Sequence, residues 1–250
     1  AVVVAGGRVF WSNGDHAGIL SVPTTAKNVA ATVVFDDPSD GDPLVGLAAA
    51  GNTLYFIQAC GGLYKAPIPT GKYSTVSQFS CNGVDMNQLA LDPAGKYVYV
   101  TDDVDGEVDS IATADGTQNV VVPSANGPMG IAVDATHVYW TEAGTCSGSD
   151  SSATCTGGEV RRAMAPSGGS ASTLVGKITS TGALGGLGQV TVDSTAVYYT
   201  VYSGATSTLY EKKLASGPVV KLATIASFAV ADGDYVYYAG GGEGVARVAR

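Results

Sequence analysis

The sequence has few charged side chains, and basic ones are the scarcest. Only 14% of the 250 residues are charged, with 13 Lys and Arg against 22 Asp and Glu, so the formal net charge is −9. Nucleic-acid binding needs clustered basic residues that replace phosphate counterions, and an anionic lipid surface would repel an acidic chain. We therefore expect no nucleic-acid partner and no membrane insertion.

Long apolar runs and helical periodicity are also missing. No run approaches the 18 or more apolar residues of a membrane-spanning helix, and no charged segment followed by an apolar one opens the chain. We expect that any signal peptide or lipid anchor has been removed. The 34 glycines and 13 tyrosines instead favour short strands joined by tight turns. The composition predicts an all-β fold in one domain, residues 1–250.

Cysteine and histidine are rare, with four and two residues respectively. Cys146 and Cys155 enclose the polar segment SGSDSSAT, which we expect to be a flexible loop, and Cys60 and Cys81 lie 21 positions apart. Zinc sites favour a spacing of two to four residues between cysteines and supporting histidines, and neither is found. The pattern predicts two disulfides and an oxidising compartment: secreted, periplasmic or cell-surface.

One phrase is repeated six times along the chain. Its second aromatic or apolar position falls at residues 10, 55, 99, 139, 198 and 237, and the one long interval contains the segment between Cys146 and Cys155. A period of about 40–45 residues with strand-like content is typical of a β-propeller blade. We predict a six-bladed propeller with blades at about 1–43, 44–85, 86–127, 128–185, 186–225 and 226–250.

The fourth repeat shows how each blade is expected to be built. Residues 130–134, 138–142, 158–164 and 171–176 read as four successive strands, the first apolar with small residues and the second with alternating large side chains. Such side chains fill the space between blades, so we interpret the Tyr139–Trp140 pair as packing and not as a ligand site.

The fourth repeat also carries a family resemblance. GIAVDATHVYWTEAG at 130–144, with GEVRRAMAPSGGSASTLV at 158–175, resembles the repeat of secreted bacterial six-bladed propellers of the YWTD/NHL-like type. The likeness extends over nearly the whole chain and is clearest at 128–175. Receptor modules of this type place Asp after Thr, which Thr101-Asp102 keeps and Thr141-Glu142 replaces. The resemblance implies the architecture and secretion but no activity, because the fold hosts many functions.

The last repeat is shorter than the others. Only three strands, at 227–231, 235–239 and 244–249, fit before Arg250, so we expect the last blade to be one strand short. An open sheet edge is a template for strand addition, and self-assembly or a partner strand at this edge is one expected mode of association.

Candidate binding residues fall in the loops that would form one face of the propeller. Acids and amides there could hold Ca²⁺, which takes six to eight oxygen ligands, although no other cofactor is expected. Asp105-Gly106 is interpreted as a hairpin turn and not as part of an EF-hand, and His137 as a residue of the opposite face. The strongest candidates are Asp85, Asn87, Gln88, Asp102, Asp103, Glu142 and Gln189. The same face is expected to carry Asn13, Asp15, His16, Gln58, Asp105, Tyr202 and Ser227.

Two functions remain open from the sequence. We favour a secreted or cell-surface binding module that uses these loops, above all the bridged segment 146–155, to bind a protein, a glycan or another copy of itself. A bridged loop loses less conformational entropy on docking than a free one. The alternative is a divalent-metal-dependent hydrolase or lactonase at the central mouth, which would use Asp85, Asn87 and Glu142.

Overall fold

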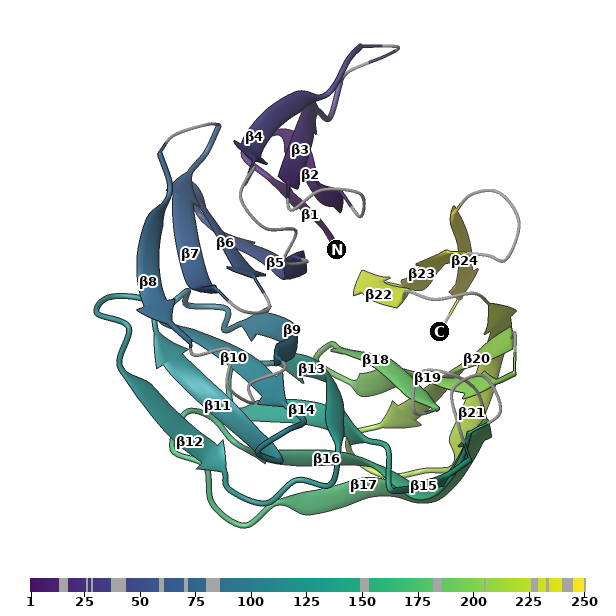
Figure 1. Cartoon of the computed structure of the whole chain (residues 1–250). Helices are drawn as coiled ribbons and strands as arrows, with labels where there is room; N and C mark the ends of the chain where they lie inside the picture. The colour runs from purple at the N-terminus through teal and green to yellow at the C-terminus, as the bar shows by residue number, and fades with distance from the viewer. Residues whose placement is uncertain are drawn as a thin grey trace. The chain divides into compact units, whose positions relative to one another are not determined.

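The computed structural model consists of β-strands and turns (Figure 1). No stretch among its described residues forms a helix that is long and apolar enough to cross a membrane. The near absence of helix expected from the composition therefore holds for the described part of the chain. The structure describes residues 1–13, 18–25, 27, 29–36, 44–58, 61–69, 72–79, 86–148, 153–181, 186–204, 206–225, 229–232, 234–239 and 245–249.

The chain divides into two compact units. The first comprises residues 1–105 and 109–120, and the second comprises 106–108 and 121–250. The predicted single domain stays a prediction, and each unit is described by itself below.

Three four-stranded antiparallel sheets lie in the first unit, the third of which has a few residues in the second. In each sheet the strands follow one another in chain order, as the repeats predict. The sheets are β1 (Val2–Ala5), β2 (Arg8–Asn13), β3 (Gly18–Pro23) and β4 (Thr32–Asp36); β5 (Leu44–Ala50), β6 (Thr53–Gln58), β7 (Gly62–Pro67) and β8 (Ser74–Gln78); and β9 (Met86–Leu91), β10 (Tyr97–Asp102), β11 (Glu107–Ala112) and β12 (Gln118–Val122).

The second unit contains a nine-stranded sheet and a three-stranded sheet. The nine-stranded sheet consists of two antiparallel meanders joined by one parallel pair, Thr181 with Ser203. Its strands are β13 (Pro128–Val133), β14 (His137–Glu142), β15 (Thr145–Ser147), β16 (Thr154–Met164), β17 (Ser172–Thr181), β18 (Leu187–Val192), β19 (Ala196–Ser203), β20 (Thr206–Lys213) and β21 (Val219–Ile225). Among the described residues, the last sheet has the three strands predicted: β22 (Ala229–Asp232), β23 (Tyr235–Ala239) and β24 (Val245–Ala249).

The first strands of consecutive repeats pack against one another within each unit. This close approach requires glycine. A Cβ on Gly46 of β5 would lie 2.7 Å from Leu89 of β9, and one on Gly130 of β13 would lie 2.6 Å from the carbonyl oxygen of Gly188 in β18. Both contacts are closer than real Cβ atoms tolerate, so the small residues of these strands set the spacing between repeats.

Side chains of the second strands alternate between two core layers. In β19, Tyr199 packs with Tyr139 and Val190, whereas Tyr198 packs on the other side with Val236. The aromatic pair of the repeat is therefore buried packing, as the sequence predicts. Trp140 is fully buried and Tyr139 nearly so.

The turn between the first two strands is held by an aspartate. Oδ1 of Asp134 accepts the backbone N–H groups of Thr136 and His137, and its Oδ2 accepts the Tyr139 hydroxyl at 2.7 Å. Burial would raise the pKa of Asp134, but the hydrogen bonds from Tyr139, Thr136 and His137 outweigh it and hold the pKa below its ordinary value. Asp193 is held in the same way in the next repeat, and its pKa is lowered likewise.

Candidate functional site

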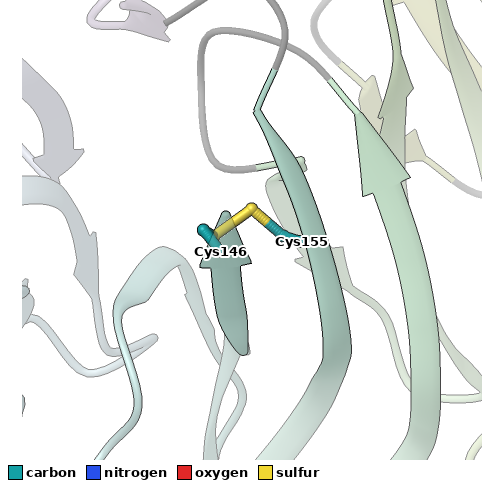
Figure 2. The surroundings of a disulfide bond; sticks show 2 residues. All are labelled: Cys146 and Cys155. Atoms are coloured by element: carbon teal, nitrogen blue, oxygen red, sulfur yellow. A yellow bond between two sulfur atoms is a disulfide. The ribbon is translucent and has the colours of Figure 1, made fainter. Parts of the chain in front are cut away.

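The segment between Cys146 and Cys155 is more ordered than the sequence suggests. A disulfide joins the two cysteines as predicted, and it links directly opposed residues of β15 and β16 (Figure 2). The expected loop is wrong for residues 145–147 and 154–157, which are strand, because pairing with neighbouring strands satisfies their backbone. Residues 149–152 lie outside the described residues. We call β15, residues 154–157 of β16 and residues 178–181 of β17 the extension.

The extension begins at three residues with positive φ: Gly144 at 80°, just before β15, Gly157 of β16 at 74° and Lys177 of β17 at 62°. The register of β16 with β17 shifts at the same level, between Thr156 and Val160. Bulges of this kind bend a strand and increase its twist, so they change the direction of the strands of the extension relative to the rest of the sheet. Lys177 is the unusual member, since side chains other than glycine seldom adopt this conformation.

Glu142, predicted to reach the surface, is buried instead, with 3% of its surface exposed. Its Oε1 accepts the indole N–H of Trp140 at 2.8 Å and lies 3.3 Å from an Arg161 guanidinium nitrogen. The prediction failed because strand alternation places position 142 on the same side as Trp140, against β16. Both partners already satisfy this carboxylate, which therefore anchors the strands below the extension.

Arg161 connects this anchor to the neighbouring strand. Its Nε lies 3.5 Å from Oε2 of Glu159, which also accepts the Thr173 hydroxyl of β17 at 2.8 Å. The guanidinium group lies over the Trp140 ring, 5.9 Å from its centroid. The two carboxylates and one guanidinium thus tie β14, β16 and β17 together at the base of the extension.

Asp102, in the first unit, is also buried and internally paired. Its Oδ1 accepts the backbone N–H groups of Val104 at 3.0 Å and Asp105 at 3.1 Å, which close the turn predicted at Asp105-Gly106. Burial raises the pKa of Asp102, and these hydrogen bonds only partly oppose it. Asp103 lies in the same turn and is exposed. Asp102 therefore acts as a turn-forming residue, as Asp134 does in the second unit.

The remaining described candidates include three glutamines. Gln88 and Gln189 are half-buried, and Gln58 is buried. Within the described part of the chain, no three His, Cys, Asp or Glu side chains gather into a group that could hold a metal ion. The predictions that lie outside the described residues, in whole or in their side chains, are Asn13, Asp15, His16, Cys60, Cys81, Asp85, Asn87 and Ser227.

Sequence reasoning missed the role of the threonine that follows the aromatic pair. The Thr141 hydroxyl accepts the N–H of Gly130 and donates to the carbonyl of Gly188, both at 2.9 Å, so it bridges two meanders in the core of the second unit. Thr101 and Thr200 occupy the same position in their repeats. The recurrence of threonine at this position is the sequence signal that could have indicated its structural role.

Comparisons with known proteins identify the fold. No family model matches the sequence, and no curated protein matches it either. A chain from the crystal structure of a nidogen/laminin complex superposes with a TM-score of 0.67 at 16% identity, covering 92% of this chain and 84% of that one. A putative TolB from Agrobacterium tumefaciens superposes with a TM-score of 0.64 at 12% identity, covering 90% of this chain and 80% of that one.

TolB from Acinetobacter baumannii gives a TM-score of 0.62 at 13% identity. The match covers 97% of this chain and 61% of that one, so this chain spans less than two thirds of that TolB. These neighbours are β-propellers. The chain accordingly has an all-β propeller fold, which confirms the fold class predicted from the repeat, whereas the count of six blades stays a prediction.

Proposed function

We propose that this protein is an extracytoplasmic interaction module that binds a protein partner through the segment that the Cys146–Cys155 disulfide closes, which the extension supports. The observation that carries the proposal is the extension itself, since the disulfide and the irregular pairing of β16 with β17 hold it beyond the regular meander. A rigid projecting element loses little conformational entropy when it docks. The solved complex of nidogen with laminin, a structural neighbour, supports a protein partner.

The proposal extends to the architecture and compartment. The strand pairing supports six blades of the YWTD/NHL-like type, because the nine-stranded sheet consists of two four-strand meanders joined at one residue pair, with β15 added. The disulfide supports an oxidising compartment, either extracellular or periplasmic. The hydrolase alternative is less favoured, because the Glu142 carboxylate that it requires is held by Trp140 and Arg161.

Site-specific photocrosslinking tests the proposal. A benzophenone amino acid replaces Ala153, beside the closed segment, and in a matched protein it replaces Thr32, an exposed residue of β4. Each protein is mixed with the extracytoplasmic fraction of its source, and adducts are identified by mass spectrometry. We expect one discrete protein adduct from position 153 and none from position 32.

A variant with a shortened closed segment tests whether this segment is the binding site. Replacing residues 148–153 by two glycines should shift the melting temperature little, since neither Gly148 nor Ala153, the described residues among them, is buried. It should abolish capture of the identified protein. Capture that persists without the segment would contradict the proposal, as would identical adducts from positions 153 and 32. Adducts that form only from positions on β24 would favour strand addition at the last sheet instead.

A further inference from the structure

A row of hydroxyl side chains crosses the nine-stranded sheet at the level of the extension. Each member pairs directly with the next in the strand register, and all of them are exposed or half-buried. The row is formed, in order across β15, β16, β17, β19 and β20, by Ser147, Thr154, Thr181, Ser203 and Thr206.

A second row lies two residues away on the same strands. Thr145 pairs with Thr156, and Thr156 pairs with Thr179, which gives each strand of the extension a Thr-x-Thr or Thr-x-Ser sequence. Alternate residues of a strand point to opposite faces. The intervening Cys155 and Ser180 are buried, whereas Thr156 and Thr179 are exposed, so the hydroxyl side chains share the solvent side. We call these two rows the hydroxyl face.

Sheet geometry gives this face a regular spacing. Neighbouring strands lie about 4.8 Å apart, so the five-residue row extends over roughly 19 Å. The two rows are roughly 6.7 Å apart, the rise of two strand residues. Some hydroxyl groups are already oriented: the Thr181 hydroxyl accepts the N–H of Gly204, and the Thr206 hydroxyl donates to the carbonyl of Ser203. Each of these hydroxyls keeps a free donor or acceptor for a ligand.

The composition of the hydroxyl face selects the chemistry of its ligand. It contains no charged and no aromatic side chain, whereas the cores of protein interfaces are enriched in Tyr, Trp, Met and Arg and depleted in Ser. A charged polymer would find no counter-charge on it, and a polyanion would be repelled by the net charge of −9. A ligand rich in neutral hydroxyl groups can both donate to and accept from every position.

From this match we infer that the hydroxyl face binds a neutral polysaccharide in an extended conformation. Each hydroxyl contact is worth only about 0.5–1.5 kcal/mol net, so a single sugar would bind weakly. A polymer whose hydroxyl groups repeat can engage several positions at once and gains affinity by effective concentration. This ligand differs from the protein partner proposed for the closed segment, and neither proposal depends on the other.

Sedimentation with insoluble microcrystalline cellulose and affinity electrophoresis in hydroxyethylcellulose test the inference. The variant T156V/T179V removes two adjacent hydroxyl groups and retains side-chain shape and strand propensity. The control T32V/T75V makes the same change at two exposed strand positions of the first unit. We expect the natural chain and the control to bind, and T156V/T179V to bind roughly tenfold more weakly, as the loss of two hydrogen bonds implies.

Binding should be nearly independent of salt, because no ion pair contributes. Three results would overturn the inference: no retention of the natural chain by either polymer, equal retention of T156V/T179V, or loss of retention in 0.5 M NaCl. Shaping of ice crystals by the natural chain but not by T156V/T179V would assign the face to an ordered water lattice and overturn it too. T156V/T179V should still give the crosslink from position 153, which separates failure of this inference from failure of the proposed function.

Discussion

Replacing Thr141 with valine tests the bridge between two meanders of the second unit. The hydroxyl is completely buried and makes two hydrogen bonds of 2.9 Å, from the N–H of Gly130 and to the carbonyl of Gly188. Valine has nearly the same shape, so T141V removes the hydrogen bonds without opening a large cavity. It leaves one donor and one acceptor of the backbone buried and unpaired.

The magnitude follows from those two groups. An unpaired buried polar group costs about 1–3 kcal/mol, so the two groups that T141V leaves unpaired should lower the free energy of unfolding by about 2–6 kcal/mol. For a chain of this length, that corresponds to a fall in melting temperature of roughly 4–24 °C. Urea unfolding followed by tryptophan fluorescence is suitable, because Trp140 is the neighbouring residue. The midpoint should fall while the slope with denaturant stays the same.

Thr200 provides a matched control. It occupies the same position in the next repeat and is 1% exposed, but its hydroxyl has no hydrogen-bond partner among the described residues. T200V therefore removes no hydrogen bond among the described residues and should change the free energy of unfolding by less than about 0.5 kcal/mol, or raise it slightly. Equal losses in T141V and T200V would refute the argument from hydrogen bonding, as would a change in T141V below 0.5 kcal/mol.

Four further substitutions separate the structural roles described above. Y139F removes the hydroxyl donor to Asp134 and should cost about 1–2 kcal/mol at pH 7. The pKa of Asp134 is lower in the folded state than its unfolded value of 3.8, so ionised Asp134 stabilises the fold above pH 3.8. This stabilisation is lost as the pH falls through the pKa of the folded state. The stability difference between the natural chain and Y139F should therefore be smaller at pH 3 than at pH 7. E142Q removes the buried charge that faces the half-buried Arg161, which keeps Glu159 as a partner, and should cost about 1–3 kcal/mol. G144A, at a φ of 80°, should destabilise by at least about 1 kcal/mol, whereas K177G should be neutral or stabilise by up to about 1 kcal/mol.

Thermal melts at pH 7 and pH 3 test Y139F, and thermal melts at pH 7 test E142Q, G144A and K177G. A stability difference between the natural chain and Y139F that is larger at pH 3 than at pH 7 would contradict the proposed hydrogen bond to an ionised carboxylate. Full stability of E142Q would contradict the anchoring role, and it would leave Glu142 free for the metal chemistry of the alternative function. Destabilisation by K177G as large as that by G144A would show that the Lys177 side chain stabilises the bulge.

The sequence repeat by itself specifies the propeller fold class and the positions of most strands. Strand positions follow from alternation and turn residues, which are local properties, so β14 and β23 begin and end within a residue of the expected positions. Burial of Tyr139 and Trp140 also followed, because large alternating side chains must fill the space between sheets. The Cys146–Cys155 disulfide was predicted because a short separation makes closure simple.

Only the tertiary structure decided what the polar residues do. Glu142 appeared to be a surface ligand until its strand placed it against Trp140 and Arg161. Residues 145–147 and 154–157 appeared to belong to a loop, but pairing among β15, β16 and β17 makes them strand. The bridge made by Thr141 and the hydroxyl face both depend on register between strands far apart in the sequence. Local patterns specify which face a residue points to, but only the packing of distant strands specifies which group it meets there.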